Sequence, residues 1–278
     1  MTVRDEGNTK SDHPTDEFGS VATEGATSHE QADVNTASEE QDISLSLVLP
    51  CYHETDVFET SMAAIDMFFE DLDWDYEYVF VEDASDDGTA ALVEEYVEEN
   101  SHARAIFHEE NRGRGRSVAD GIRAASNPIV GYLDIDLEVT IHQLYPLVRA
   151  VQNGADVLCG YRHYKQNLSR LHRLLLSVGY KHLARLVIDS PFNDPEAGCK
   201  FFKRDKILPV IEETHSDHWF WDTEVMMRAH NAGLDVREYP VLFVGNDEAG
   251  STVDIWSDIP DYLRNLWHFR RENYSKLV

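Results

Sequence analysis

Short apolar runs alternate with amphipathic segments along the chain from residue 43 onward. The runs predict strands, because aliphatic and aromatic residues fill a buried pleated surface. They cover 44–49, 76–82, 103–107, 129–133 and 156–161. Apolar positions at three- and four-residue spacing predict helices over 57–70, 89–99, 116–125 and 142–153. Strands that alternate with helices predict an α/β fold, in which a Rossmann-like, mostly parallel sheet is covered by helices on both faces.

The regular alternation ends after residue 161. The pattern beyond it predicts a long helix, a short strand and three further helices, over 168–188, 200–202, 205–213, 223–231 and 255–272. No segment repeats another, and no apolar run reaches the roughly 18 residues that span a bilayer. We therefore expect one domain over residues 43–278.

Residues 1–42 differ from the rest in composition. They hold 11 acidic and two basic residues, ten Ser or Thr and one aromatic residue, Phe18, with no apolar period. Such a segment buries too little surface to offset the entropy of ordering, so we expect a disordered acidic tail. A specific docking arm is the alternative.

The whole chain is strongly acidic, with 52 acidic against 24 basic residues and a formal charge of −28. A field of this sign repels phosphate polymers, which disfavours a nucleic-acid partner. The 17 Arg and seven Lys, with the acid excess, resemble the composition of proteins adapted to high internal salt, where the Debye length falls to about 3 Å. Three scattered cysteines and an N-terminus unlike a signal peptide indicate a cytoplasmic protein.

Acidic residues follow the fourth predicted strand. Asp134, Asp136 and Glu138 occupy alternate positions, so an extended backbone would present all three carboxylates on one side. Oxygen ligands favour Mg²⁺ or Mn²⁺, and such an ion would neutralise a diphosphate leaving group. The alternative is a polar loop in an acid-rich protein.

The ends of the first two strands are also polar. Pro50 is expected to end the first strand, and Asp83, after the second, can accept a hydrogen bond from a base edge. Asp86, Asp87 and Thr89 are typical of turn and N-cap chemistry before a helix. Ligands of open α/β sheets bind at the carboxyl ends of strands, so these positions are candidates for a binding site.

The stretch Asn111-Arg-Gly-Arg-Gly-Arg-Ser117 places three arginines and two glycines at the start of a helix. Glycines allow close backbone approach, and a helix N-terminus favours anions. A nucleotide phosphate and the nearby acids are both candidate partners. The stretch is neither a P-loop nor a Rossmann fingerprint.

Residues 157–188 contain no Asp or Glu, although the average composition predicts about six. Basic and polar residues at three- and four-residue steps lie opposite a leucine-rich face; they are Arg170, Arg173, Ser177, Lys181 and Arg185. A basic amphipathic helix in an acidic protein is typical of a binding site for an anionic lipid head group. The alternative is a core helix whose basic face pairs with surrounding acids.

Asp222 follows the aromatic run Trp219-Phe-Trp221. It lies near the predicted start of a helix, where an acid is often an N-cap. A carboxylate held in an apolar cleft is the other interpretation.

Taken together, these segments resemble the inverting family 2 glycosyltransferases of the GT-A fold, over residues 44–275. The resemblance rests on Pro50-Cys-Tyr-His-Glu54, on Asp83-Ala-Ser-Asp-Asp-Gly-Thr89, on Asn111-Arg-Gly-Arg-Gly115 and on Asp134-Ile-Asp136, which is similar to the metal-binding Asp-x-Asp motif of the family. Within the family, the chain is most similar to dolichyl-phosphate glucose and mannose synthases of haloarchaeal type. The segments that carry this closer likeness are Asp194-Pro-Glu-Ala-Gly-Cys-Lys200, Trp221-Asp-Thr-Glu224, Gly160-Tyr-Arg162 and the pair Arg173 and Ser177. The chain departs from the usual family residues at His53, Glu82, Arg114, Glu196 and Cys199.

The resemblance implies a metal-dependent enzyme that moves a hexose, with inversion, from a UDP- or GDP-hexose to a polyprenyl (dolichyl) phosphate for protein or surface glycosylation. The implied nucleotide contacts are Pro50, Tyr52, Glu54, Asp83, Arg114, Arg116 and Asp134. Asp134, Asp136 and Glu138 would hold Mg²⁺ or Mn²⁺, and the acceptor phosphate would bind Arg162, Arg173, Ser177 and Lys200. Asp136 and Asp222 are the implied catalytic residues. Asp222 would act as a base, or it would instead position the acceptor or order the loop Trp219–Trp221. The enzyme is expected to be peripheral on the cytoplasmic face of the membrane.

Two alternative functions remain open. One is transfer to a soluble sugar or glycan, in which case the basic helix is structural. The other is a non-catalytic sugar-nucleotide binding protein that docks through its acidic tail. A sugar-phosphate nucleotidyltransferase is disfavoured, because Pro50-Cys-Tyr-His53 stands where that class has a glycine-rich turn.

Overall fold

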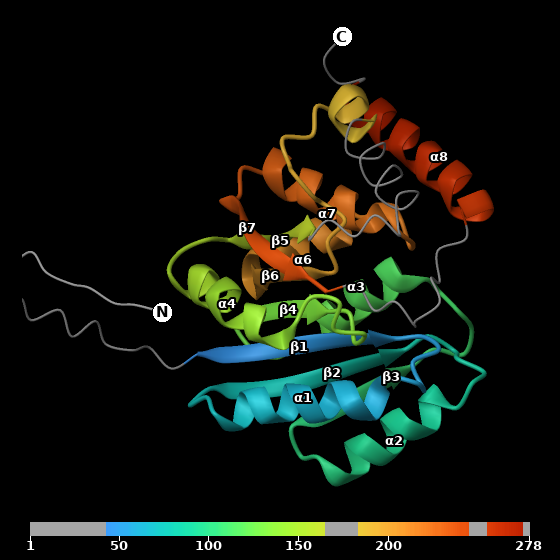
Figure 1. The fold of residues 1–278 in the computed structure, drawn as a ribbon. Helices are drawn as coiled ribbons and strands as arrows, with labels where there is room; N and C mark the ends of the chain where they lie inside the picture. Colours follow the sequence, from blue (N-terminus) through green and yellow to red (C-terminus); the bar gives the residue numbers. More distant parts are fainter. Residues whose placement is uncertain (1–42, 165–182, 245–254, 275–278) are drawn as a thin grey trace, which may run out of the picture. The chain divides into compact units, whose positions relative to one another are not determined.

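The computed structural model describes residues 43–164, 183–244 and 255–274 of the chain. The predicted acidic tail at 1–42 lies outside these residues. From residue 44, strands alternate with helices as the sequence predicts (Figure 1). In chain order the elements are β1 (Ser44–Cys51), α1 (Phe58–Glu70), β2 (Asp75–Glu82), α2 (Thr89–Glu99), β3 (Ala103–Phe107), α3 (Arg114–Ala124), β4 (Ile129–Leu133), η1 (Ile141–Gln143), α4 (Leu144–Gln152), β5 (Val157–Tyr164), β6 (Cys199–Lys203), α6 (Arg204–Glu212), α7 (Phe220–Asn231), β7 (Val236–Phe243) and α8 (Ile255–Tyr274).

The described strands form one sheet of seven, in the order β3-β2-β1-β4-β6-β5-β7. Neighbouring strands run parallel except at β6, which is antiparallel to both β4 and β5. The strands β1, β2 and β4 therefore end at the same edge, and the segments that follow them meet there. This edge carries the acidic residues that the sequence singles out.

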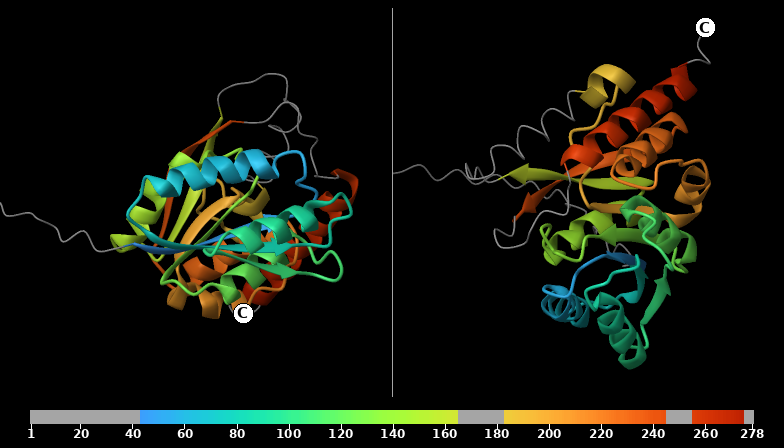
Figure 2. Two further views of the ribbon diagram at one scale, coloured as in Figure 1. Left: turned by 90° about the horizontal axis from the view of Figure 1, so that it is seen from below. Right: turned by 90° about the vertical axis from the view of Figure 1, so that its right-hand side faces the viewer.

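Hydrophobic cores lie on both faces of the sheet. Along β1 successive side chains point to opposite faces, so Leu47 and Leu49 enter one core and Val48 enters the other. Helices α1, α2 and α4 contribute to the first core, and α3, α6, α7 and α8 contribute to the second (Figures 1 and 2). The predicted α/β fold, with a mostly parallel sheet covered on both faces, is confirmed.

Two strand features differ from the sequence prediction. β7 was not predicted, because Val236–Phe243 lies at the edge of the sheet and most of its residues are not buried. β1 does not stop before Pro50, which pairs with Val81 of β2. Because the β4 ladder on the other side ends at Val48, Pro50 lies where β1 has a partner strand on one side only.

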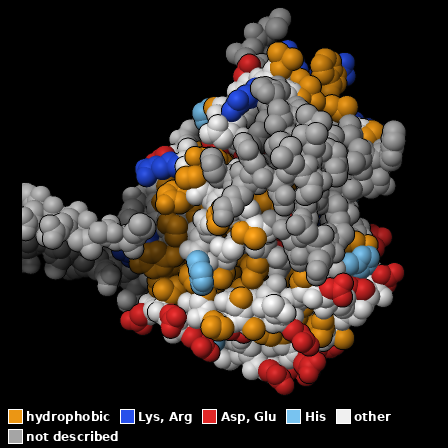
Figure 3. Space-filling model, in the orientation of Figure 1, with side chains coloured by type: hydrophobic (Ala, Val, Ile, Leu, Met, Phe, Trp, Pro, Cys, Tyr) orange, Lys and Arg blue, Asp and Glu red, His pale blue; other side chains and the backbone are white. Residues whose placement is uncertain are grey.

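The acidic character of the chain is visible on the outer surface of the helices. On the face shown in Figure 3, acidic side chains gather over α1 and α2. Helix α2 alone exposes four glutamates, Glu94, Glu95, Glu98 and Glu99. Among the described helices, none is both long and apolar enough to cross a bilayer.

Candidate active site

The chain leaves β4 in a turn that carries Asp134 and Asp136. The Leu137 N–H donates to the Asp134 carbonyl at 3.2 Å, and Leu137 has a left-handed φ of 51°. Oδ1 of Asp136 accepts the Glu138 N–H at 3.0 Å. The expected extended array of Asp134, Asp136 and Glu138 is therefore wrong. Within the described ranges, no three acidic, His or Cys side chains are placed to hold one metal ion.

Asp134 and Asp136 share a negative field with Glu54, which follows β1. Burial, and then repulsion from Asp134, raises the pKa of Asp136 to about 7. Burial, and then repulsion from Asp136 and Asp134, raises the pKa of Glu54 to about 8. Carboxylates that repel one another in this way favour a cation, and Mg²⁺ needs only one or two of them when substrate phosphates supply further ligands. The Asp134–Asp136 pair therefore fits a divalent ion bound together with a diphosphate.

Arg114, in the first turn of α3, reaches the turn after β4. Its Nε and Nη2 both donate to Oδ1 of Asp134, at 2.9 and 2.6 Å. Its Nη1 donates to Oδ2 of Asp222 at 2.6 Å. The guanidinium also lies over the rings of Tyr132 and Trp219, at 5.4 and 5.6 Å from their centroids. One side chain therefore joins the acidic turn to helix α7.

Asp222 and Lys200 form a buried ion pair on the other side of this link. Oδ1 of Asp222 accepts hydrogen bonds from the Lys200 ammonium at 2.5 Å and from the Tyr132 hydroxyl. Lys200 also donates to the Tyr132 oxygen at 2.8 Å and to the Ala197 carbonyl at 2.7 Å. Burial alone would raise the pKa of Asp222, but Lys200 and Arg114 together hold it below its ordinary value.

This buried network corrects two expected roles. Lys200 is fully buried, and its three N–H groups are all engaged, so it is not placed to bind an acceptor phosphate. Asp222 has both oxygens bound and a lowered pKa, which is the opposite of what a general base requires. The geometry therefore disfavours Asp222 as a base, and it shows a contact that the sequence did not predict, in which Asp222 holds Arg114.

Gly198, just before β6, lies directly against the acidic turn. Its carbonyl accepts the Asp134 N–H at 3.2 Å. A Cβ at this position would lie 1.7 Å from Oδ2 of Asp134 and 3.0 Å from Nη2 of Arg114. A side chain here would push the Asp134 carboxylate away, so glycine allows the carboxylate to lie where Arg114 binds it.

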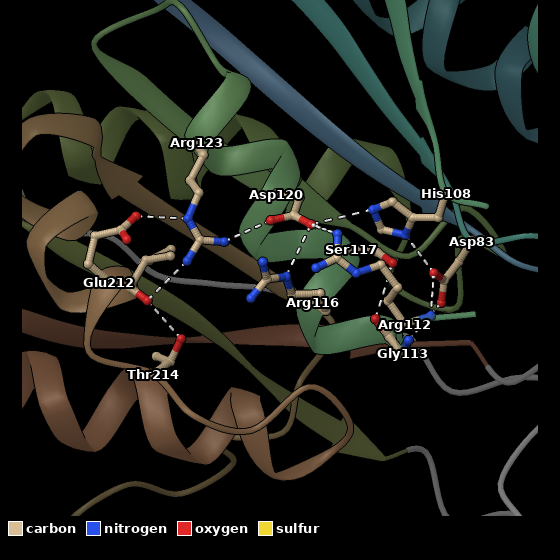
Figure 4. Close-up of polar contacts among 11 residues, drawn as sticks. Asp83, His108, Arg112, Gly113, Arg116, Ser117, Asp120, Arg123, Glu212 and Thr214 are labelled. Carbon is tan, nitrogen blue, oxygen red and sulfur yellow. Dashed lines mark hydrogen bonds and ion pairs between the residues drawn. The ribbon is translucent and has the colours of Figure 1, made fainter. Parts of the chain in front are cut away.

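Asp83, at the end of β2, anchors the start of α3 (Figure 4). Its Oδ1 accepts the Arg112 N–H and its Oδ2 accepts the Gly113 N–H, both at 2.9 Å. Nδ1 of His108 lies 2.7 Å from Oδ1, and Nε2 of His108 lies 3.4 Å from Asp120. The candidate partners of this helix start were a nucleotide phosphate and nearby acidic residues. In the structure an acidic residue, Asp83, contacts it. The expected contact of Asp83 with a base is not supported, because its side chain is 3% exposed and both oxygens are engaged.

Arg116, which was expected at the diphosphate, contacts Asp120 instead (Figure 4). Nε of Arg116 lies 3.2 Å from the Asp120 carboxylate. Arg112 and Arg123 contact the same carboxylate at 3.1 and 2.8 Å. Among the described arginines of the glycine-rich stretch, Arg114 is therefore the one that contacts the acidic turn.

The end of β1 presents an aromatic surface. The rings of Tyr52 and His53 stack with centroids 4.0 Å apart, and Tyr52 is 38% exposed. Nε2 of His53 lies 2.8 Å from Asp86, and His53 has a left-handed φ of 60°. Tyr52 is therefore open to a flat ligand such as a base. Pro50 is buried within β1, so its side chain does not reach this surface.

The turn after β2 has the structural role that its sequence indicates. Asp87 Oδ1 accepts the N–H and the hydroxyl of Thr89, at 3.0 and 2.7 Å. The Thr89 hydroxyl oxygen accepts the Glu54 N–H at 2.8 Å. Burial would raise the pKa of Asp87, but hydrogen bonds from Thr89 and Thr55 lower it to about 2. The turn thus holds Glu54 at the edge of the sheet.

Arg162, an expected acceptor-phosphate ligand, is clamped by Asp194. Its Nε and Nη2 contact the two carboxylate oxygens at 2.7 and 2.9 Å, and its backbone N–H donates to the same group. Nearby, burial raises the pKa of Glu196 to about 7, against the lowering effect of a Tyr262 hydrogen bond and of Arg162. The other expected ligands, Arg173 and Ser177, lie outside the described residues.

Sequence reasoning missed three residues of this network. Tyr132 lies in an apolar strand and could not be told from a core residue. His108 has no motif around it. Asp120 could have been found, because it lies four residues after Arg116 on a predicted helix, which is the spacing of an ion pair.

A sequence profile of glycosyl transferase family 2 matches residues 46–208, which is more than half of the chain. The chain belongs to this family and is a glycosyltransferase. Among its relatives, glycosyltransferase AglD from Haloferax volcanii is 29% identical over an alignment of 234 residues, which covers 81% of this chain and 37% of AglD. The chain thus spans little more than a third of that relative. The dolichyl-phosphate β-glucosyltransferase of Dictyostelium discoideum is 23% identical over an alignment of 244 residues, which covers 82% of this chain and 74% of that protein.

The fold is similar to that of glucosyl-3-phosphoglycerate synthase from Mycobacterium tuberculosis, in its crystal structure with Mn²⁺, uridine diphosphate and glucosyl-3-phosphoglycerate. The TM-score is 0.55 at 15% identity, over 83% of this chain and 79% of that one. This likeness concerns the fold, and it confirms the predicted GT-A architecture.

Proposed function

We propose that this glycosyltransferase moves a hexose from a nucleotide-diphosphate sugar to a polyprenyl (dolichyl) phosphate, with inversion at the anomeric carbon. The observation that carries the proposal is the acidic turn at Asp134 and Asp136, which faces Glu54 and is bound by Arg114 at the carboxyl edge of the sheet. Similarity to dolichyl-phosphate β-glucosyltransferases supports the acceptor class. We expect the reaction to serve protein or surface glycosylation.

The donor is proposed to bind at the ends of β1 and β4. Tyr52 offers an exposed ring for the base, and Glu54 lies beside the acidic turn. Arg114 would bind the diphosphate bidentately, as guanidinium groups do. Asp134 and Asp136 would hold Mg²⁺ or Mn²⁺, which when bound would neutralise the charge of the departing nucleotide.

The acceptor needs no strong base. The second pKa of a phosphate monoester is about 6, so its oxygen is already a nucleophile at neutral pH. This agrees with an Asp222 whose pKa is lowered and whose oxygens are engaged. Arg162, which Asp194 holds in place, is proposed to orient the phosphate together with Arg173 and Ser177.

The place of action follows from the acceptor. A polyprenyl phosphate resides in a membrane, so the enzyme is proposed to work as a peripheral protein on the cytoplasmic face. The basic, leucine-rich pattern around residues 168–188 is the proposed contact with anionic lipid head groups. Nucleic acid is not a proposed partner of so acidic a chain.

The test is a donor screen with polyprenyl phosphate in membranes, at high salt, with radiolabelled UDP- and GDP-hexoses and with or without Mg²⁺ or Mn²⁺. Asp136→Asn is expected to lose transfer, whereas Asp73→Asn, an exposed acid away from the sheet edge, is the matched control. Labelled product in the lipid extract is the expected result. Label in a water-soluble glycan would indicate a soluble acceptor, and binding of a donor without turnover would indicate a non-catalytic protein; either result refutes the proposal.

A further inference from the structure

Arg114 binds one oxygen of the Asp134 carboxylate, and the other oxygen lies against Gly198. Oδ1 accepts Nε and Nη2 of Arg114, at 2.9 and 2.6 Å. Oδ2 lies so close to Gly198 that a Cβ there would be 1.7 Å away. A divalent ion binds a carboxylate oxygen at about 2 Å. An ion at this carboxylate would lie close to the guanidinium and would be strongly repelled by it, so the ion and Arg114 compete for Asp134.

Arg114 can leave Asp134 without exposing an uncompensated buried charge. Its second partner, Asp222, also accepts a hydrogen bond from the Lys200 ammonium at 2.5 Å. Asp222 thus keeps a cation whichever way Arg114 turns. Loss of a partner is costly mainly for a buried charge, and the Asp134 side chain is 37% exposed. The contact between Arg114 and Asp134 is therefore the part of the network that a ligand can replace.

We propose that Arg114 and the divalent ion occupy Asp134 in alternation, and that the nucleotide diphosphate drives the exchange. A guanidinium binds phosphate oxygens bidentately, so the diphosphate offers Arg114 a new partner at the moment when Oδ1 is released. The metal ion then binds together with the nucleotide, and it binds weakly alone. This inference rests on the proposed function, because it takes Asp134 and Asp136 as the binding site of the divalent ion.

The negative charge of the chain suggests why Arg114 covers Asp134 when no nucleotide is bound. A protein with a formal charge of −28 attracts divalent cations to many carboxylates. A guanidinium on Asp134 keeps the acidic turn closed to such ions. The site then opens to an ion that arrives with the diphosphate, which is the form the reaction uses.

The test measures Mn²⁺ binding to the full chain without nucleotide, from the loss of the electron paramagnetic resonance signal of free Mn²⁺. Molar KCl screens the surface carboxylates. Arg114→Gln releases Oδ1 while Asp222 keeps Lys200, so Mn²⁺ is expected to bind about tenfold more tightly than to the wild type. Added UDP or GDP is expected to tighten Mn²⁺ binding by a larger factor in the wild type than in the variant.

Three further variants make the result specific. Arg123→Gln removes one guanidinium from the same helix, where it contacts Asp120, and is expected to leave Mn²⁺ affinity unchanged. Asp134→Asn in the Arg114→Gln background is expected to cancel the gain. Arg114→Lys replaces two converging N–H groups by one ammonium and is expected to gain about twofold. It supplies the decisive measurement if circular dichroism shows that Arg114→Gln does not fold.

Two outcomes would overturn the inference. One is an equal Mn²⁺ affinity of the wild type and the folded Arg114 variants; the other is a gain that survives Asp134→Asn. The binding measurement requires no sugar transfer. A gain in Mn²⁺ affinity without transferase activity would therefore support the inference and refute the proposed function, and transfer with unchanged affinity would do the reverse.

Discussion

The ammonium of Lys200 lies 2.5 Å from Oδ1 of Asp222, and neither side chain is more than 1% exposed. The pair joins β6 to α7 through the interior of the domain. Arg114 contacts the same carboxylate and extends the link to the acidic turn after β4. Stability and the geometry of the site are therefore coupled through one buried acid.

Loss of the lysine tests the stability side of this coupling. Lys200→Met is expected to lower the free energy of unfolding by about 3 kcal/mol, because removal of one partner of a buried pair leaves the other partly uncompensated. Lys203 lies on the same strand and contacts Asp156 nearer the surface. Lys203→Met is therefore expected to lower the free energy of unfolding by less than about 1 kcal/mol. Urea unfolding of the three proteins provides the comparison. Equal losses in the two variants would contradict the role assigned to the buried pair.

Loss of the acid tests the catalytic side. Asp222→Asn is expected to slow transfer about tenfold through poorer placement of Arg114, less than the 10²–10⁴ that general-base catalysis typically supplies. The shape of the pH profile of kcat/KM is expected to stay the same, because its acidic limb then comes from the acceptor phosphate, whose second pKa is about 6. Steady-state rates with polyprenyl phosphate between pH 5.5 and about 9 measure this. A profile that loses its acidic limb in the variant would restore Asp222 as a base.

The contact between Gly198 and Asp134 predicts that a larger residue at position 198 displaces the Asp134 carboxylate. Gly198→Ala is expected to reduce transfer at least about a hundredfold, because the new methyl group takes the place of Oδ2 and moves the carboxylate. Gly154→Ala is the control: its Cβ meets nothing within 4 Å, and its φ of 117° imposes a backbone cost of its own. Activity and unfolding are measured on both. A fully active Gly198→Ala protein would show that Asp134 is not held where the structure places it.

Glu196 predicts a pH dependence of stability. Its pKa is about 7 in the folded chain, raised by burial and by Asp194 and Asp222 against Arg162 and Tyr262, and 4.5 is its ordinary value. Between these two values the folded state binds more protons than the unfolded state, so this group makes stability fall as the pH rises through the window.

Glu196→Gln removes that dependence. The variant and the wild type are expected to have similar free energies of unfolding near pH 4.5, where Glu196 is protonated in the folded state. Above about pH 7 the variant is expected to be the more stable, because it buries no charge. Denaturant unfolding across this range is the measurement. A constant difference between the two proteins at every pH would exclude the assigned pKa.

The sequence predicts the first half of the fold well, because each strand there is a buried apolar run followed by an amphipathic helix. It does not predict that β6 lies between β4 and β5, since pairing between strands distant in the chain depends on tertiary packing. It also misses β7, whose residues are half exposed at the sheet edge and so lack a continuous apolar run.

The sequence identifies the acidic residues of the candidate site, but it identifies fewer of the side chains that bind them. Asp134 and Asp136 stand out because they directly follow a buried strand. Residues two apart on a helix point about 200° apart, so helix geometry predicts that Arg114 and Arg116 contact different acids, but it does not show which of them contacts Asp134. The roles of Lys200 and Asp222 depend on burial and on contacts between β6 and α7, which no spacing in the sequence reveals.

The position of β6 also bears on how the chain is made. Cys199–Lys203 is synthesised after both strands between which it lies, β4 and β5. Until then each of these strands presents an open hydrogen-bonding edge, which is the kind of surface that invites aggregation. Until β6 is made, nothing among the described strands connects β4 to β5, so the sheet of seven cannot form. The segment that brings Gly198 and Lys200 to the acidic turn is thus also the one that joins the two parts of the sheet.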